Sequence, residues 1–229
     1  MNPKQLKHLN RILLICAAVC LLCYDHFRGL WLKGFTSSWF VLLGGVNLWA
    51  AREADRNRLR FFLLMEAGLF CGMCADVLLG ITFLAGVLVF ALGHVLYFAA
   101  FCHLEKFSLR DLGIIIPLAL AAIYVVVGTP WITVEEPLMM KLLLGYAVII
   151  SGMLGKAISN LLRSPDPCRW LLAIASLLFW FSDLMLAVNM FGHASRLFWI
   201  LCSYSYWPAQ NLLAHALFHA PLKERKQHV

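Results

Sequence analysis

A chain of 229 residues with 62% hydrophobic and only 14% charged residues is too apolar for a soluble globular domain, in which about a quarter of the residues carry charge. The composition therefore argues against a soluble enzyme or carrier. The formal net charge of +7 comes from basic residues scattered over short connecting segments. This pattern argues against a nucleic-acid partner and indicates contact with anionic lipid headgroups.

Runs of about 20 apolar residues have the length that an α-helix needs to cross the hydrocarbon core of a bilayer. In chain order, such runs predict eight helices, at 12–27, 36–51, 61–80, 82–102, 112–129, 138–160, 169–191 and 196–218. They leave no room for a soluble domain, so the sequence predicts one all-α transmembrane domain over residues 1–229. The first run has no convincing cleavage site after it, and we interpret it as a retained helix rather than a signal peptide.

Basic residues are distributed unevenly over the two sides of the predicted bundle. Of the 19 lysines and arginines, fourteen fall on the side that holds the N-terminus, here called side A. Lys156 falls within the sixth run, and side B holds only Arg28, Lys33, Lys141 and Arg196. Because cytoplasmic loops carry the excess of basic residues, both termini are predicted to be cytoplasmic. The expected location is the inner or plasma membrane in a bacterium and an endoplasmic-reticulum-type membrane in a eukaryote.

The eight cysteines do not form a metal-binding framework in the sequence. Cys20 and Cys23, like Cys71 and Cys74, have the CxxC spacing of zinc sites, but both pairs fall inside apolar runs without a cluster of Cys or His partners. Free cysteine packs as a small apolar residue. The sequence therefore predicts neither a metal nor another cofactor.

Two aspartates lie deep inside predicted membrane helices, each in a similar segment. Residues 75–79 read ADVLL around Asp76, and residues 182–186 read SDLML around Asp183, 107 positions later. A carboxyl group within a bilayer costs roughly 2.5–3.5 kcal/mol on insertion scales, so it usually faces the bundle interior and serves a function. Each aspartate falls in the third helix of a four-helix half, roughly 21–24 Å from side A at 1.5 Å per residue. The repeat predicts two parallel halves around one polar site, with chance similarity of short apolar segments as the alternative.

Other polar residues occur at helical spacings in the same part of the chain. His94 and Tyr97 share a face of the fourth run, as Tyr206 and Gln210 do in the eighth. Lys33 lies at the side-B start of the second run, and three hydroxyl residues follow it: Thr36, Ser37 and Ser38. Any one of these alone is more often a hydrogen-bonding group between helices than a catalyst. Together with two aspartates, they exceed what helix packing needs.

Two further patterns concern helix packing. Gly68 and Gly72 precede Asp76 at four-residue spacing, and such a stripe lets another helix approach closely. It would hold Asp76 against a neighbouring helix. Glu66 and Lys156 both lie toward side A, and we expect them to pair with each other.

The polar segments resemble those of the YhhN-like lysoplasmalogenase family. The resemblance rests on GMCADVLL at 72–79 with FALGHVLY at 90–97, and on ASLLFWFSDLMLA at 175–187 with YWPAQNLLA at 206–214. It covers most of the chain, from about residue 33 to residue 214. KGFT at 33–36 is similar to the family's Lys-Pro-Leu-Thr segment but has Gly34 where the family favours proline. The resemblance implies a multi-pass enzyme that cleaves the vinyl ether bond of lysoplasmalogens to a fatty aldehyde and a glycerophospho-base.

The residues suit that chemistry independently. A vinyl ether reacts after its β-carbon is protonated, which gives an oxocarbenium ion that water captures as a hemiacetal. The reaction needs an acid and, opposite it, a base or anionic stabiliser, as paired carboxyl groups provide for glycosides. Asp76 and Asp183 are the predicted pair, and the sequence leaves open which of them is the acid. The residues expected to hold the carboxyl groups and water are His94, Tyr97, Tyr206 and Gln210.

The position of the pair also predicts how a substrate lies. Both aspartates are nearer side B by residue count, where Lys33 and Arg196 are basic. We expect the headgroup phosphate near Lys33, with Arg196 as a second candidate, and the vinyl ether one or two helical turns deeper. The alternative is that Lys33 only extends to the membrane interface.

Two other functions fit the same physical pattern. Paired halves and membrane-embedded carboxyl groups suit a transporter or proton-coupled carrier equally well. A lipid-binding scaffold without turnover would tolerate Asp→Asn changes at both positions. The resemblance favours the hydrolase, with a lysophospholipid, water and membrane lipids as its expected partners.

Overall fold

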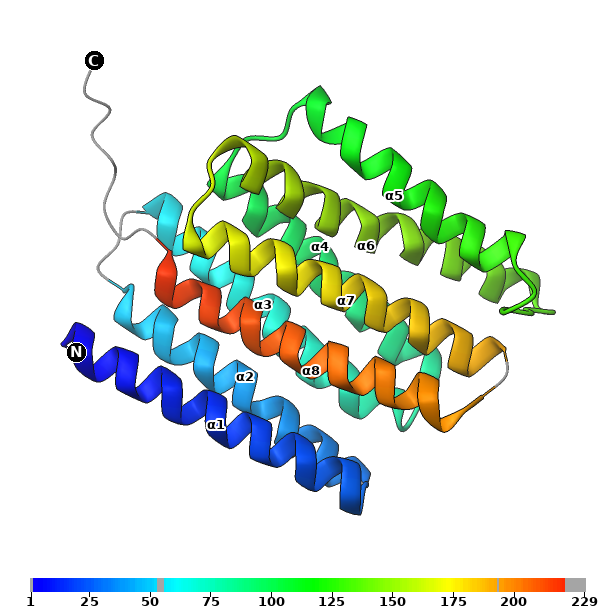
Figure 1. Ribbon diagram of the computed structural model, residues 1–229, viewed down its shortest axis with the longest axis horizontal. Helices are drawn as coiled ribbons and strands as arrows, with labels where there is room; N and C mark the ends of the chain where they lie inside the picture. The colour runs from blue at the N-terminus through cyan, green and yellow to red at the C-terminus, as the bar shows by residue number, and fades with distance from the viewer. Residues whose placement is uncertain (1, 53–55, 193, 221–229) are drawn as a thin grey trace.

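A computed structural model describes residues 2–52, 56–192 and 194–220. Over these residues the chain folds into eight α-helices and contains no β-strand. The helices are α1 (Pro3–Phe27), α2 (Leu30–Ala50), α3 (Arg56–Leu79), α4 (Phe83–Leu104), α5 (Leu109–Gly128), α6 (Pro137–Arg163), α7 (Pro167–Phe191) and α8 (Arg196–His219). Successive helices run in opposite directions, so α1 begins and α8 ends at the same end of the bundle (Figure 1). The prediction of an all-α bundle of eight helices is confirmed.

Local signals explain why the first two helices begin earlier than the apolar runs predict. The Asn2 side chain accepts a hydrogen bond from the Lys4 N–H, and the Gln5 side chain accepts one from the Asn2 N–H, which forms a capping box ahead of the apolar run. The turn after α1 consists only of Arg28 and Gly29, which have φ values of 50° and 131°. Because this turn is so short, α2 already contains Lys33 in its first turn.

Six helices, α1 and α3 to α7, are long and apolar enough to cross a membrane by length and composition. The other two, α2 and α8, have similar lengths but carry polar residues on their buried faces, among them Ser37, Asn47, Ser205 and Gln210. The outer surface of the bundle exposes many large apolar side chains, such as that of Phe70. These features identify an integral membrane bundle that encloses a set of buried polar groups.

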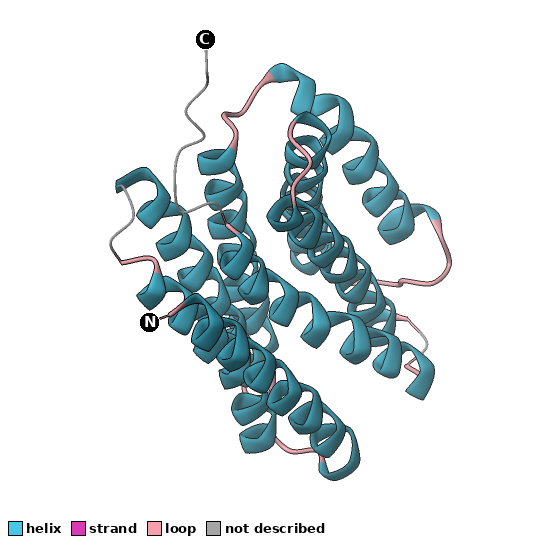
Figure 2. Ribbon diagram, turned by 60° about the vertical axis from the view of Figure 1, so that its left-hand side comes forward, coloured by secondary structure: helices cyan, strands magenta, loops and turns pink. Residues whose placement is uncertain are grey.

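The two four-helix halves pack in the same way. In the first half α3 lies along α4, as α7 lies along α8 in the second. Between the halves, α2 packs on α8 and α6 packs on α4, so the second helix of each half contacts the fourth helix of the other. Over the described residues, Figure 2 shows the bundle as helices joined by loops, with no sheet. The odd-numbered helices all run in one direction in Figure 1, as the predicted parallel halves require.

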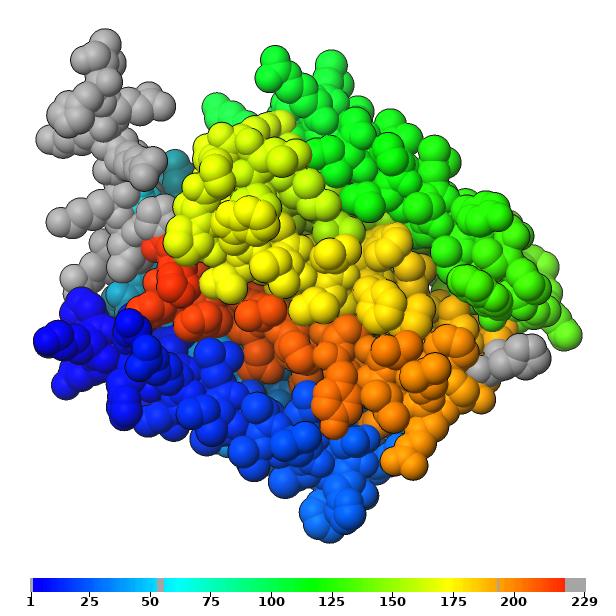
Figure 3. Space-filling view, in the orientation of Figure 1, coloured from blue at the N-terminus to red at the C-terminus, as the bar shows by residue number. Residues whose placement is uncertain are grey.

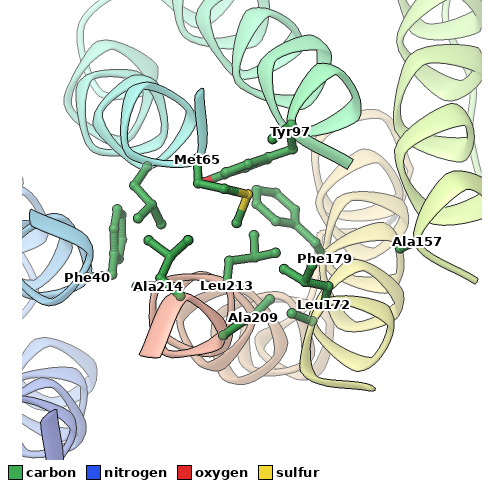
Figure 4. Packing of buried hydrophobic residues seen from close by; sticks show 14 of the residues in the cluster. Phe40, Met65, Tyr97, Ala157, Leu172, Phe179, Ala209, Leu213 and Ala214 are labelled. Carbon is green, nitrogen blue, oxygen red and sulfur yellow. The ribbon is translucent and has the colours of Figure 1, made fainter. Parts of the chain in front are cut away.

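An apolar core fills the space where the two halves meet. Phe40, Met65, Phe179 and Leu213 come from four different helices, and each is at most 1% exposed (Figure 4). The core reaches the hydroxyl-bearing ring of Tyr97, which is also 1% exposed. Polar groups at the centre of the bundle are therefore surrounded by packed side chains, which fix their positions.

The predicted pair of Glu66 and Lys156 is wrong. The Lys156 ammonium lies 3.1 Å from Asp111 and also donates to the carbonyl of Lys106. The reason is tertiary: α6 packs along α5, which carries Asp111 in its first turn, rather than along α3, which carries Glu66. Within the described part of the chain, Oε2 of Glu66 has no hydrogen-bond partner.

The orientation of the bundle in the membrane is testable with reporter fusions. We expect both termini to be cytoplasmic, because fourteen basic residues lie on side A and four on side B. Three of the side-A residues, Lys223, Arg225 and Lys226, lie outside the described residues. A reporter active only in the cytoplasm should be active at Val229, and one active only after export should be silent there. The opposite pattern would reverse the assignment of the two sides.

Candidate active site

Asp76 lies in the last turn of α3 and is enclosed by three donors. Its Oδ2 accepts hydrogen bonds from the Ser37 hydroxyl at 2.5 Å and the Tyr206 hydroxyl at 2.7 Å. The Lys33 ammonium lies 3.3 Å from Oδ1. The Asp76 side chain is 2% exposed, whereas Lys33 is 20% exposed and reaches the edge of the site. An ammonium and two hydroxyl donors around one carboxyl group stabilise its ionised form.

Asp183 lies two turns before the end of α7 and has a different set of partners. Its Oδ2 accepts a hydrogen bond from the Tyr146 hydroxyl at 2.5 Å, and Nε2 of His94 lies 3.2 Å from the same oxygen. The Ser182 hydroxyl lies 3.2 Å from Oδ1. His94 Nε2 is also 2.8 Å from the Tyr146 oxygen, so the three side chains form one cluster. With the side chain of Asp183 10% exposed, this carboxyl group is more open than that of Asp76.

A chain of hydrogen bonds connects Asp76 to α4. The Tyr97 hydroxyl donates to Gln210 Oε1 at 2.7 Å, and Gln210 Nε2 donates to the Tyr206 oxygen at 3.3 Å. Tyr206 then donates to Asp76. Because the Gln210 amide uses both of its ends in this chain, its orientation and that of the Tyr206 hydroxyl are fixed.

The glycine stripe on α3 makes room for this chain. A Cβ atom at Gly68 would collide with the Tyr97 ring, and one at Gly72 would collide with the Gln210 amide. The predicted close approach of a neighbouring helix is therefore present, and it is made by side chains of α4 and α8. The stripe leads to Asp76 and leaves space for the groups that position it.

The two aspartates are held in equivalent ways. Asp76 on α3 is contacted from α2, the preceding helix of its own half, and from α8, the fourth helix of the other half. Asp183 on α7 is contacted from α6 and from α4, which occupy the corresponding places. Each carboxyl group therefore lies at the seam between the halves. The partners differ, however, because only Asp76 has a lysine.

Both aspartates line one cavity of about 80 Å³ inside the bundle. Tyr206 and Lys33 also line it, with apolar walls from Phe90 and Leu186. A water molecule needs roughly 10–15 Å³ of such space, so the cavity that both aspartates line has room for several waters. The arrangement brings two carboxyl groups and water together in an enclosed, largely apolar site.

The cavity opens toward side B through two wider spaces. A mouth of about 350 Å³ contains Lys33, Asn189 and Trp199, all of which also line the cavity. Beyond it lies an open vestibule of about 860 Å³, where Arg196 and Arg28 are found. The Arg28 guanidinium lies 4.1 Å from the centroid of the Trp199 ring. The entrance is therefore lined by Arg28 and Arg196 together with Asp25, and Asp76 and Asp183 lie deeper.

The structure brings together most of the side chains that the sequence singles out. Asp76, Tyr206, Gln210, Tyr97 and Lys33 form one connected set. Asp183 and His94 form a second set, and the cavity joins the two. Two of the hydroxyl residues after Lys33 lie apart from the carboxyl groups, because their side chains bond to the backbone: Thr36 and Ser38.

Tyr146 is the site residue that the sequence patterns do not reveal. It lies in the middle of α6, and the residues three and four positions away on either side are all apolar. The only signal is its separation of 37 residues from Asp183, which is close to the 39 residues between Ser37 and Asp76. Residues 2–52, 56–192 and 194–220 contain no group of three His, Cys, Asp or Glu side chains that could hold a metal ion. All eight cysteines are free thiols.

The fold and the cavity define a multi-pass helical membrane protein in which two aspartates line one small internal cavity. The sequence model of the YhhN family matches residues 12–217, nearly the whole described bundle, and the chain belongs to the YhhN family. This confirms the family resemblance found in the polar segments. Comparison with curated proteins and with solved structures gave no match.

Proposed function

We propose that the protein is a lysoplasmalogenase-like hydrolase that cleaves the vinyl ether bond of 1-alkenyl lysophospholipids. Membership of the YhhN family supports this proposal, since the family resemblance implies that chemistry. The observation that carries it is that Asp76 and Asp183 line the same cavity, which has room for water. Two carboxyl groups and a water molecule are the parts that acid-catalysed hydration of a vinyl ether requires.

The proposed reaction begins with protonation. Asp183, as the acid, transfers its proton to the β-carbon of the vinyl ether, and the π electrons form the new C–H bond. The positive charge then rests on the α-carbon and the ether oxygen. The Asp76 carboxylate stabilises this cation and takes a proton from the water that attacks the α-carbon. The hemiacetal collapses when its hydroxyl group gives a proton to Asp183, its glycerol oxygen takes the proton held by Asp76, and the C–O bond to that glycerol oxygen breaks. This releases the aldehyde and returns both carboxyl groups to their starting states.

The contacts of the two carboxyl groups support these roles. Asp76 has the Lys33 ammonium at 3.3 Å and two hydroxyl donors, which favour the anion. Asp183 has no lysine or arginine within ion-pair distance among the described residues. It also lines an apolar pocket next to the cavity, where a hydrocarbon group would lie. Tyr146 and His94 act as positioning residues, because both contact the oxygen of Asp183 that faces them.

The direct test is aldehyde release from purified protein in detergent. With a lysoplasmenylethanolamine substrate, we expect one aldehyde for each glycerophosphoethanolamine formed. A 1-alkyl lysophospholipid is the matched control, because it has the same shape but no double bond to protonate. If correctly folded protein forms no product but takes up the lipid into sealed liposomes, the hydrolase proposal is overturned and the transporter is favoured.

Lys33 offers a test that separates its two expected roles. We expect Lys33→Met to lower kcat by about tenfold or more, because the change removes the positive charge beside a buried carboxylate. A contact between Lys33 and the headgroup phosphate would add a rise in KM. Lys33→Arg keeps the charge and should restore part of kcat. A rise in KM with kcat unchanged would limit Lys33 to the headgroup.

A further inference from the structure

The outer helices of the two halves break the symmetry of the bundle. In the first half α1 packs on both α2 and α8, and Tyr24 contacts the rings of Trp199 and Trp207 with centroid distances of 6.0 and 4.9 Å. In the second half α5 occupies the corresponding place, but among the described helices its substantial contacts are with α6 alone. The two helices lie along opposite edges of the molecule (Figure 3). In the first half the outer helix α1 packs against α8, whereas in the described part of the chain the outer helix α5 of the second half makes no comparable contact with α4.

An apolar pocket of about 50 Å³ lies between α5 and α4, where this contact is missing. Its walls come from four helices: Ala122 and Val126 from α5, Val87 from α4, Ile150 from α6 and Ala187 from α7. Nearly all of its lining is apolar. The main exceptions are Asp183 and Tyr146, which are hydrogen-bonded to each other.

The pocket and the carboxylate cavity meet at Asp183. Phe90, Asp183 and Leu186 line both spaces. From the vestibule inward, the surroundings therefore change from charged groups of both signs, among them Arg28, Arg196 and Asp25, to the two carboxyl groups and then to apolar side chains. A molecule that matches this order has a charged headgroup, a reactive bond and one apolar chain, in that sequence.

We propose that the pocket between α4, α5, α6 and α7 binds the first carbons of the single aliphatic chain of the substrate, beside Asp183. This inference rests on the proposed function and adds the direction in which the lipid lies. The headgroup extends to the side-B vestibule, and the chain enters the second half of the bundle rather than the first. A single apolar pocket next to Asp183 accounts for a substrate with one chain rather than two.

The wall formed by α5 is fixed at both ends. Near its start, Asp111 is held by Lys156, Arg163 and Ser159 of α6. Beyond its end, the Thr133 N–H donates to the carbonyl of Phe191 on α7 at 2.7 Å. A larger side chain on the inner face of α5 will therefore fill the pocket rather than displace the helix.

Two neighbouring alanines of α5 supply a matched pair of variants. Ala122 is 1% exposed and lines the pocket, whereas Ala121 is exposed on the outer face. We expect Ala122→Phe to reduce kcat/KM for a long-chain alkenyl lysophospholipid, relative to a short-chain one, by about tenfold or more, since each methylene in an apolar pocket contributes strongly. Ala121→Phe should leave this ratio as in the wild type. Ala187→Phe, on the opposite wall, is the second variant if Ala122→Phe does not fold.

A binding measurement separates failure of this inference from failure of the proposed function. Non-cleavable 1-alkyl lysophospholipids of long and short chain are compared by the thermal stabilisation that they give. If the long-chain lipid no longer stabilises Ala122→Phe against thermal unfolding but still stabilises Ala121→Phe, the result supports the pocket. This holds even if the wild type proves to have no hydrolase activity. Normal hydrolysis with the same chain-length preference in Ala122→Phe, Ala187→Phe and wild type would overturn the pocket while leaving the function intact.

Discussion

Asp76→Asn and Asp183→Asn should each reduce turnover by about 10²–10⁴-fold, the usual effect of removing an acid–base group. Asparagine keeps the volume of aspartate and can still accept from the surrounding hydroxyl donors. It cannot transfer a proton to carbon or carry the negative charge that stabilises an oxocarbenium ion. The measurement is aldehyde release from a lysoplasmenylethanolamine at saturating substrate, with thermal unfolding in the same detergent as the check on folding.

The two variants should also differ from each other. In Asp76→Asn the Lys33 ammonium loses its counter-charge, so some stability is lost as well. In Asp183→Asn no such ammonium is left behind among the described residues, and the melting behaviour should stay close to wild type. A variant that keeps more than about a tenth of the wild-type rate would show that its aspartate is not the acid or base that the mechanism requires. Activity in both variants would favour a lipid-binding scaffold.

The sequence predicts the parts of the site that one helix alone defines. Tyr206 and Gln210 are one turn apart on α8, and both take part in the chain of hydrogen bonds that ends at Asp76. Asp76 itself is identified because a carboxyl group within a membrane carries a large free-energy cost and so indicates a function. In each case the signal is a polar group in an apolar helix at helical spacing from another polar group, which only a shared buried face explains.

The contacts between helices are beyond such patterns. His94 and Tyr97 share a face of α4, yet His94 contacts Asp183 and Tyr97 contacts Gln210, because α4 lies between the two halves. Tyr146 has no polar neighbour on its own helix and is recruited only by the packing of α6 on α7. The wrong pairing of Glu66 with Lys156 has the same origin. Depth along a helix is readable from sequence, whereas the identity of the neighbouring helix is not.

The cluster around Asp111 should matter for stability rather than for turnover. Asp111 and Lys156 have fully buried side chains, and the cluster lies near the start of α5, away from the cavity. The Asp111 carboxylate also contacts Arg163 and Ser159. Its side-chain partners in this cluster therefore all belong to α6, apart from contacts within the first turn of α5. This cluster and the apolar contacts with α6 are the main attachments of α5 to the bundle.

Asp111→Asn is therefore expected to lower the free energy of unfolding by about 3–5 kcal/mol, because it leaves the Lys156 ammonium buried without its counter-charge. The measurement is unfolding in mixed detergent micelles, with kcat of the folded protein recorded in parallel. Glu105→Gln is the control, since its ion pair with Arg169 is partly exposed and should contribute at most about 1 kcal/mol. The folded fraction of Asp111→Asn should keep its kcat.

A second substitution distinguishes an unpaired charge from a simple loss of contacts. In Asp111→Leu with Lys156→Met, both buried charges are gone, and Arg163 can remain hydrated because its side chain is 27% exposed. We expect this double variant to be more stable than Asp111→Asn alone, since apolar replacement of a buried ion pair is often nearly neutral. If the double variant is less stable than Asp111→Asn, the cluster stabilises the protein through its hydrogen bonds rather than through charge pairing. Wild-type stability in Asp111→Asn would show that the cluster does not anchor the start of α5, which would leave the apolar contacts with α6 and the Thr133 hydrogen bond beyond its end as its attachments.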